Sequence, residues 1–258
     1  MTSDDYLPGS IVLAHSLRAH GWKHPTVAVV TAGVTQPIRE KLASWWDRVV
    51  EVEGIPNPHP KEEQWFHYFG DMYSKLRIWS MTEYDRIVYL DSDILVTGSV
   101  EELLDRPRFA AAPCTTPADT FNGGVLVLDP DLEVYQDMLS KVGKIPSHDG
   151  SDQGFLNTYY SDWFTGPAEH RLPIKFNVPQ TLFLSGMGWK RVLPDMRVLH
   201  FVSPAKPWKR RAARFGRFGY RAMSRWANAA GGTTPTEMWL QGWEAATGSS
   251  KPPWKGVP

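Results

Sequence analysis

The stretch Asp85-Arg86-Ile87-Val88-Tyr89-Leu90-Asp91-Ser92-Asp93-Ile94-Leu95-Val96-Thr97 decides the fold class, because an apolar run leads directly into two carboxylates one residue apart. Continuous apolar residues around the Asp-x-Asp pair predict a strand that is covered on both faces. Open α/β sheets bind their ligands at the carboxyl ends of such strands. We therefore expect Asp91 and Asp93 at the ligand-binding edge of a sheet.

Two carboxylates placed in this way suit a hard divalent cation. Magnesium and manganese complete their octahedral shells with water and substrate phosphates, so Asp91 and Asp93 indicate a diphosphate ligand more than a closed structural metal site. The alternative is a plain turn at the strand end, since Asp and Ser favour turns through hydrogen bonds to nearby backbone. The motif alone leaves both interpretations open.

The composition is that of an ordinary soluble α/β protein with one core: 258 residues, 42% hydrophobic and 22% charged. Equal totals of 28 basic and 28 acidic residues argue against general nucleic-acid binding. The single cysteine, Cys114, excludes an internal disulfide and fits a reducing compartment. The sequence shows neither an apolar run of membrane-spanning length nor a signal-peptide pattern at its start, so we expect a cytoplasmic protein.

Helical and strand patterns alternate along the chain, which is typical of a mostly parallel sheet wrapped by helices. Three prolines predict a loop over residues 54–60, and Ser99 with Glu102 predicts a capping box for a short helix through Leu104. Periodicity predicts helices over residues 9–20 and 36–47 and strands over residues 27–31, 49–52, 109–112 and 125–128.

A second polar cluster, residues 148–157, stands at the expected start of a helix. Asp149 or Ser151 would serve as its N-cap, and that structural role is the simpler interpretation of each residue alone. Upstream, Asn122-Gly123-Gly124 adds paired glycines that let a ligand approach the backbone closely. Asp, Asn and Gln side chains together offer the donors and acceptors that sugar hydroxyls require.

A third cluster, residues 198–208, contains His200 on an apolar strand pattern and Lys206 between alanine and proline. A buried structural histidine is the alternative to a metal ligand. With an Asp-x-Asp pair upstream, an imidazole would supply a third metal ligand, and a lysine would neutralise a diphosphate. An imidazole also shifts the expected metal from magnesium toward manganese.

Five motifs in this order give the chain a resemblance to the family 8 retaining glycosyltransferases, the glycogenin family. The resemblance implies a single Rossmann-like GT-A domain that uses a UDP-sugar and Mn²⁺, with Mg²⁺ as the alternative metal. It also leaves a homodimer open. The motifs lie at residues 74–80, 89–93, 121–124, 149–154 and 200–208.

The resemblance further implies a role for each matching residue. Asp91, Asp93 and His200 would be metal ligands, and Lys206 would hold the diphosphate. Asp152 and Gln153, with Lys206, would be the catalytic residues, and front-side attack is favoured over a protein nucleophile. Tyr6 would stack on the uracil ring. The donor-binding residues would be Tyr6, Lys75, Asp91, Ser92, Asn122, Gly123, Asp149, Asp152, Gln153 and Lys206.

The sequence departs from the family pattern in three places. Relatives have an apolar strand ahead of the loop that here begins at Met1, so we expect the first strand of the nucleotide-binding sheet to be missing. Ser203 replaces the family's glycine three residues after the histidine. Between Tyr160 and Tyr220 the sequence has no tyrosine, so we expect a separate hydroxyl acceptor, whether saccharide, lipid or protein, and no self-glucosylation.

The region after the last motif is rich in basic and aromatic residues, with no acidic residue between Lys206 and Glu237. Such a stretch would contact an anionic membrane or acceptor, or would be a solvated helix packed by its aromatic face. Thr234 and Glu237 predict a capped helix through Ala246. We therefore divide the chain into a GT-A domain (1–208), a basic helical C-terminal extension (209–246) and a disordered tail (247–258).

The function expected from the sequence is metal-dependent, retaining transfer of a hexose from a UDP-sugar to a hydroxyl. Two alternatives belong to different classes. A degenerate scaffold that binds a sugar nucleotide without catalysis would fit the missing first strand. A nucleotidyltransferase that makes UDP-sugars would need a Gly-rich basic triphosphate loop near the N-terminus, and the sequence has none.

Overall fold

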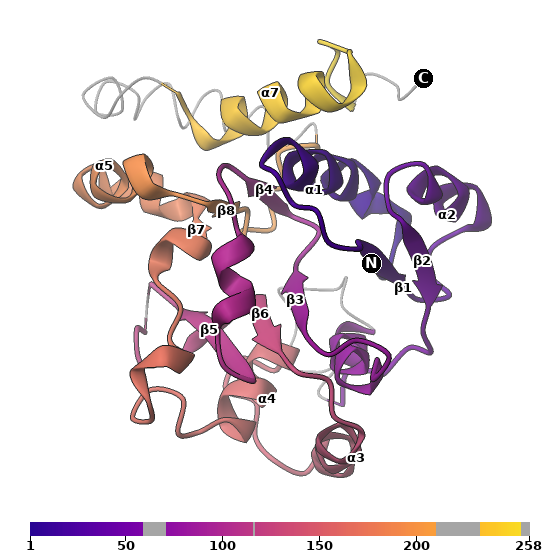
Figure 1. Ribbon diagram of the computed structural model, residues 1–258, viewed down its shortest axis with the longest axis vertical. Coiled ribbons are helices and arrows are strands. Elements are labelled where there is room, and N and C mark those ends of the chain that lie inside the picture. Colours follow the sequence, from indigo (N-terminus) through magenta and orange to yellow (C-terminus); the bar gives the residue numbers. More distant parts are fainter. Residues whose placement is uncertain (59–70, 116, 210–232, 254–258) are drawn as a thin grey trace.

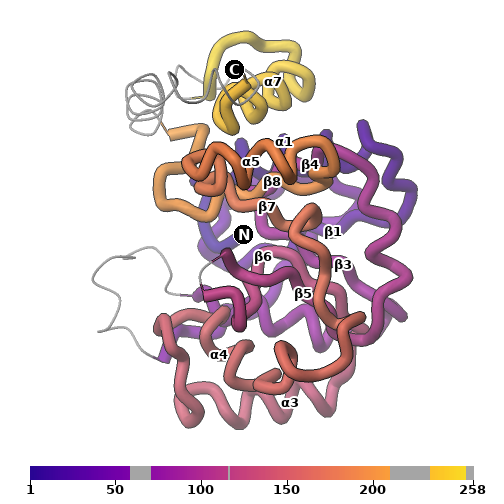
Figure 2. The backbone as a smooth tube through the Cα atoms, turned by 90° about the vertical axis from the view of Figure 1, so that its left-hand side faces the viewer, coloured from indigo at the N-terminus to yellow at the C-terminus, as the bar shows by residue number. Residues whose placement is uncertain are grey.

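The strands form a central layer between two groups of helices, α1 and α7 on one side and α3 and α4 on the other (Figures 1 and 2). The structure is a computed structural model that describes residues 1–58, 71–115, 117–209 and 233–253. Its helices are α1 (Leu7–Ala19), α2 (Gln36–Ala43), α3 (Leu132–Lys141), α4 (Asp152–Tyr159), α5 (Met187–Val192) and α7 (Pro235–Thr247). Its strands are β1 (Val27–Val30), β2 (Arg48–Glu51), β3 (Ile87–Leu90), β4 (Ile94–Val96), β5 (Phe109–Pro113), β6 (Phe121–Leu128), β7 (Val178–Pro179) and β8 (Val198–His200).

The strand pairings confirm the α/β class but correct the prediction of a mostly parallel sheet. Strands β1 and β2 pair in parallel, as do β7 and β8. In the order β3-β6-β5 both pairings are antiparallel, and β4 pairs antiparallel with β8. Apolar residues predict where a strand lies and which faces are covered, but they carry little information about the direction of its partner.

The apolar run around the Asp-x-Asp pair is two strands in different sheets, where the sequence pattern suggested one. Strand β3 ends at Leu90 and pairs with β6, whereas β4 begins at Ile94 and pairs with β8. The three residues between them form the turn that the alternative interpretation expected. Two sheets therefore meet at Asp91 and Asp93. Both carboxylates lie near the start of β6 and the end of β8.

Two predicted helix caps have different outcomes. Thr234 and Glu237 form the capping box at the start of α7, as predicted. Ser99 and Glu102 do not form one: the segment is a short 3-10 helix (Glu101–Asp105) that starts after Val100 without a side-chain cap. Glu102 instead lies 3.1 Å from Lys175 Nζ, so an ion pair to a distant segment replaces the local bond.

The first residue of the chain lies beside β1 as one residue of a parallel strand. The Met1 amine donates to the Val29 carbonyl, and the Thr31 N–H donates to the Met1 carbonyl at 3.0 Å. Bonds from one residue to positions on either side of Val30 are the parallel-strand pattern. Burial lowers the pKa of this amine to about 6.

The C-terminal helix α7 lies over α1 (Figure 1), and its buried tryptophans belong to the same apolar cluster as Leu7, Ile11 and Val12 of α1. Trp239 and Trp243 stack at 5.9 Å, and Trp243 Nε1 donates to the Lys251 carbonyl at 3.1 Å. Most of the basic stretch of the predicted extension, residues 210–232, lies outside the described residues, as do residues 254–258 of the predicted disordered tail. No helix within the described part of the chain is long and apolar enough to cross a membrane.

Candidate active site

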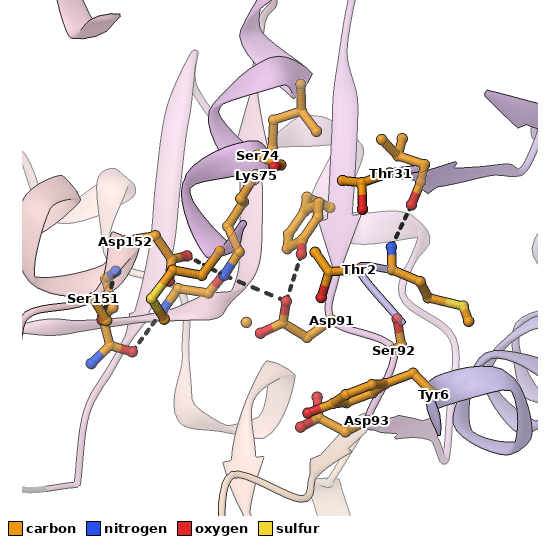
Figure 3. Close-up of a pocket in the computed structure, with 18 of the residues that line it drawn as sticks. Thr2, Tyr6, Thr31, Ser74, Lys75, Asp91, Ser92, Asp93, Ser151 and Asp152 are labelled. Atoms are coloured by element: carbon orange, nitrogen blue, oxygen red, sulfur yellow. Dashed lines mark hydrogen bonds and ion pairs between the residues drawn. The ribbon is translucent and has the colours of Figure 1, made fainter. Parts of the chain in front are cut away.

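One cavity of about 450 Å³ lies where β3, β6 and β8 meet the start of α1 and α4 (Figure 3). Every site residue that the sequence indicated lines this cavity. Lys75 and Asp152 lie on one side of Asp91, with Tyr6 and Asp93 on the other. The structure therefore brings together residues that are up to 200 positions apart.

Asp91, Asp93 and His200 form the candidate metal centre. Each offers one ligand atom, and these atoms lie within 4.8 Å of one another. The imidazole Nε2 is 3.2 Å from Asp93 Oδ1 and 3.9 Å from Asp91 Oδ2. Two carboxylates and one imidazole at the edge of the cavity are a donor set that suits a divalent metal ion. The residues present therefore fit a divalent ion.

Asp93 is buried, and the His200 ring and the Lys206 ammonium each approach one of its oxygens. Lys206 Nζ lies 2.5 Å from Oδ2 and also donates to the Phe201 carbonyl at 2.7 Å. Burial alone would raise the pKa of the Asp93 carboxyl, but its interactions with His200 and Lys206 outweigh burial and hold this pKa well below its usual range. Asp93 therefore stays ionised across the ordinary pH range.

A chain of side-chain amides joins the metal centre to the other side of the cavity. His200 Nδ1 is 2.9 Å from Asn177 Oδ1, and Asn177 Nδ2 donates to Asn122 Oδ1 at 2.8 Å. Asn122 Nδ2 in turn donates to Gln153 Oε1 at 2.9 Å. Because Asn177 donates through its nitrogen, its oxygen accepts from Nδ1–H, which leaves the Nε2 lone pair for a metal ion.

Asn177 is a residue that the sequence analysis missed. It lies directly before β7, between the buried residues Phe176 and Val178, and is itself 3% exposed. A polar residue between fully buried apolar ones was the available signal, because a buried amide needs partners. Its hydrogen-bond partners, Asn122 and His200, lie on β6 and β8, and the residues around Asn177 in the sequence do not predict them.

Lys75 stands at the centre of a buried charge cluster. Its Nζ lies 2.7 Å from Asp152 Oδ2, 3.4 Å from Asp91 Oδ1 and 3.1 Å from the Gly123 carbonyl. Burial opposes its charge, yet the two carboxylates hold the pKa of the ammonium well above its usual value. For Asp152 burial is the larger influence and raises the pKa of the carboxyl. Tyr89 completes the cluster by donating its hydroxyl to Asp91 Oδ1 at 2.5 Å.

Asp149 organises the loop ahead of α4. Its Oδ1 accepts from the Ser151 N–H at 2.9 Å, the Ser151 hydroxyl at 2.8 Å and the Gly154 N–H at 3.0 Å. Of the two predicted N-caps, Asp149 and Ser151, the structure uses Ser151, whose hydroxyl accepts from the Gln153 N–H. These bonds fix the first turn of α4, which presents Asp152 and Gln153 to the cavity.

Glycines allow the close packing on β6 that the site requires. A Cβ on Gly124 would collide with the His200 ring, so this position takes no side chain. Gly123 donates its N–H to Gln153 Oε1 at 3.0 Å, and a Cβ there would meet Lys75 Nζ at 3.4 Å. The paired glycines thus let His200 and Lys75 approach the strand from opposite faces.

Tyr6 and Ser92 lie at the other end of the cavity, near the chain start. The Tyr6 ring packs edge-on against Trp208 at 5.7 Å, and Trp208 Nε1 donates to the Asp5 carbonyl at 2.8 Å. Burial, with nearby carboxylates, raises the pKa of the Tyr6 hydroxyl. Thr2, Thr31 and Val30, which the sequence analysis did not select, also line this end.

Comparison with solved structures shows the class of fold. The galactosyltransferase LgtC in complex with donor and acceptor sugar analogs superposes with a TM-score of 0.59 at 18% identity, over 94% of this chain and 100% of that one. The apo-form glycosyltransferase GlyE of Streptococcus pneumoniae TIGR4 gives 0.58 at 19% identity, over 94% of this chain and 58% of that one. The fold is that of GT-A glycosyltransferases.

Sequence comparison then identifies the family. Residues 1–212 match the family described as Glycosyl transferase family 8, and the chain belongs to it. Glycogenin-1 of Caenorhabditis elegans is 34% identical over 215 residues, 82% of this chain and 50% of that protein. Human glycogenin-1 is 32% identical over 210 residues, 80% of this chain and 60% of that protein.

A relative named for a different activity matches with a similar identity. Inositol phosphorylceramide glucuronosyltransferase 1 of Arabidopsis thaliana is 31% identical over 226 residues, 80% of this chain and 41% of that protein. The chain therefore spans about half the length of the curated relatives it matches.

Proposed function

We propose that the protein is a retaining, metal-dependent glycosyltransferase that moves a hexose from a UDP-sugar to the hydroxyl of a separate acceptor. One observation carries the proposal: the Asp91–Asp93–His200 cluster and the Lys75–Asp152 pair line the same cavity. A cation site beside a buried polar pocket suits a ligand with a diphosphate at one end and a polyol at the other.

Asp91, Asp93 and His200 would hold the metal ion, which we expect to be Mn²⁺, with Mg²⁺ as the alternative. When bound, the ion supplies positive charge to the diphosphate of the donor. Lys206 supplies a second positive charge at the same end of the cavity. Departure of UDP places negative charge on its β-phosphate, so charge held ready at this position favours the transition state.

Lys75, Asn122, Asp152 and Gln153 would surround the transferred sugar. Asp152 Oδ2 is paired with Lys75 Nζ at 2.7 Å, and the remaining lone pairs of this carboxylate would accept from a sugar hydroxyl. We favour attack of the acceptor on the same face that UDP leaves, with the departing phosphate taking the acceptor's proton. Gln153 is held by Asn122 and Gly123, which suits a role in orientation more than in bond formation.

The acceptor would be a different molecule. Thr181 and Ser185 are the hydroxyl residues of the segment 178–186, where glycogenin relatives are expected to carry their acceptor tyrosine. Both are exposed and neither lines the cavity. Intact-protein mass spectrometry after incubation with UDP-sugars and Mn²⁺ should show no hexose ladder on residues 178–190. A ladder there would contradict the separate acceptor.

Release of UDP from UDP-glucose, UDP-galactose, UDP-glucuronate and UDP-N-acetylglucosamine, with Mn²⁺ present, tests the proposal. We expect at least one donor to be hydrolysed or transferred, and Asp93→Asn to lose that activity. Asp119→Asn is the matched control, because Asp119 is exposed and does not line the cavity. UDP binding without turnover of any donor would favour the non-catalytic scaffold. The cytoplasmic location and the membrane contact of the basic stretch stay predictions.

A further inference from the structure

Helix α7 lies outside residues 1–212, the part of the chain that matches the family, yet aromatic rings connect it to the candidate active site. The ring centroids of Trp239 on α7 and Trp208 are 5.5 Å apart, and those of Trp208 and Tyr6 are 5.7 Å apart. Tyr6 lines the cavity on the same side as Asp93 (Figure 3), whereas Trp208 and Trp239 are buried. Trp208 therefore links α7 to the wall of the cavity.

Trp208 is also held by closely packed neighbours near the start of the chain. A Cβ on Gly9 of α1 would lie 2.7 Å from the Trp208 ring, so α1 approaches this ring as closely as a glycine permits. The indole Nε1 donates to the Asp5 carbonyl at 2.8 Å, and Nζ of the following Lys209 lies 2.9 Å from Asp5 Oδ2. With Trp239 in contact as well, the Trp208 side chain is fixed by α1, by the segment before it and by α7.

Trp208 lies near the end of the loop of residues 201–209, the Lys206 loop. This loop begins at Phe201, whose N–H donates to the Asp93 carbonyl at 2.9 Å. After Phe201, its backbone hydrogen bonds within the described part of the chain stay inside the loop, as from the Lys206 N–H to a carbonyl two residues earlier at 3.1 Å. Two anchors, Phe201 and Trp208, therefore determine where the Lys206 ammonium lies, 2.5 Å from Asp93 Oδ2.

We propose that Trp239 is a positioning residue for the nucleotide end of the active site: it holds Trp208, and Trp208 holds the Lys206 loop against the cavity. Trp239 is fully buried, so it acts through Trp208 and not by touching a ligand. The nucleotide in this inference rests on the proposed function. The support that α7 gives to the loop is a property of the chain without ligands.

Truncation of Trp239 should loosen the Lys206 loop. Trp239→Leu leaves a cavity beside Trp208, because surrounding side chains fill such a space only in part. Trp208 would then adopt further rotamers, and the Lys206 ammonium would spend less time at the diphosphate end of the cavity. A ligand that needs one conformation binds more weakly by the fraction of molecules that hold it, so a loop in place in about one fifth of molecules lowers UDP affinity about fivefold.

The first measurement needs no ligand. Amide hydrogen exchange at Phe201 and Lys206 in the full chain, relative to the amides of β6, should quicken about fivefold or more in Trp239→Leu. Trp243→Leu is the matched control, because Trp243 is a buried tryptophan of the same helix whose indole donates to the Lys251 carbonyl at 3.1 Å. Both variants should have a lower thermal midpoint, but the control should leave exchange in the loop, relative to β6, unchanged.

The second measurement is UDP affinity in calorimetry with Mn²⁺ present. Trp239→Leu should lower this affinity about fivefold, and Trp243→Leu less than about twofold. Lys206→Met removes the ammonium that the loop positions. Adding Trp239→Leu to Lys206→Met should therefore cost little further affinity, so that the two losses combine to less than their product.

Loop exchange that quickens equally in Trp239→Leu and Trp243→Leu would overturn the inference, because α7 would then contribute stability alone. Unchanged UDP affinity in Trp239→Leu, or losses that multiply fully with Lys206→Met, would overturn it as well. Should Trp239→Leu fail to fold, Trp239→Phe keeps a ring beside Trp208 and undergoes the same comparison with Trp243→Phe. A parent chain that binds no UDP contradicts the proposed function, whereas loop exchange still decides whether Trp239 holds the loop.

Discussion

Replacing Asn177 by alanine tests whether the amide chain prepares the metal centre. The substitution removes the oxygen that accepts from His200 Nδ1–H and the nitrogen that donates to Asn122. His200 would then be free to rotate or to change tautomer, and its Nε2 would no longer face Asp91 and Asp93 for most of the time. Loss of a partner that orients a ligating histidine lowers metal affinity about 10–100-fold, or roughly 1.4–2.7 kcal/mol.

The assay is a titration of Mn²⁺ with a constant concentration of UDP, in which electron paramagnetic resonance reports the free ion. Asn177→Asp keeps an oxygen for His200 and loses the donor to Asn122, so its loss of affinity should be the smaller one. Asn157→Ala is the matched control, because Asn157 bonds the Phe121 backbone twice at 2.9 Å without touching His200. Unchanged Mn²⁺ affinity in a folded Asn177→Ala, or an equal loss in Asn157→Ala, would refute the reasoning.

Three further substitutions have distinct expected outcomes. Asp93→Ala should abolish the divalent-dependent part of UDP binding in calorimetry while thermal unfolding stays cooperative; retained Mn²⁺-dependent affinity would remove Asp93 from the metal centre. Lys206→Met should bind Mn²⁺ more tightly without nucleotide, because Nζ no longer occupies Asp93 Oδ2, yet lower turnover by about 100-fold or more; weaker Mn²⁺ binding without UDP would contradict this. Asp152→Asn should slow single-turnover transfer with donor affinity little changed, and a normal rate would exclude it from the catalytic centre.

The sequence predicts the local parts of this fold well. Helix α1 and strands β1 and β3 follow from apolar periodicity, and the capping box of α7 follows from Thr234 and Glu237. The failed cap at Ser99 shows the limit, because Glu102 forms an ion pair with Lys175, which is 73 residues away. Local propensity decides such a cap only when no stronger distant partner competes for the same carboxylate.

The direction of the strands and the chain of hydrogen-bonded amides could not be predicted from the sequence, for a different reason. The apolar residues of β6 predict that this strand is buried. Its antiparallel alignment with β3, however, depends on connections elsewhere in the chain. The candidate site residues came from motif order, whereas Asn177 belongs to no motif. Its role depends on the pairing of β7 with β8, which aligns Pro179 with His200 and leaves Asn177, directly ahead of β7, within reach of the His200 ring.

The 113 positions between Asp93 and Lys206 have a consequence during synthesis on the ribosome. The two aspartates emerge first, and the histidine and lysine follow at the far end of the region shared with the family. At a translation rate of about 5–20 residues per second, the carboxylates precede these two partners by roughly 6–23 s. A nucleotide ligand therefore cannot assist the folding of the nascent chain through this centre, and its stabilising effect begins only when translation has passed residue 206.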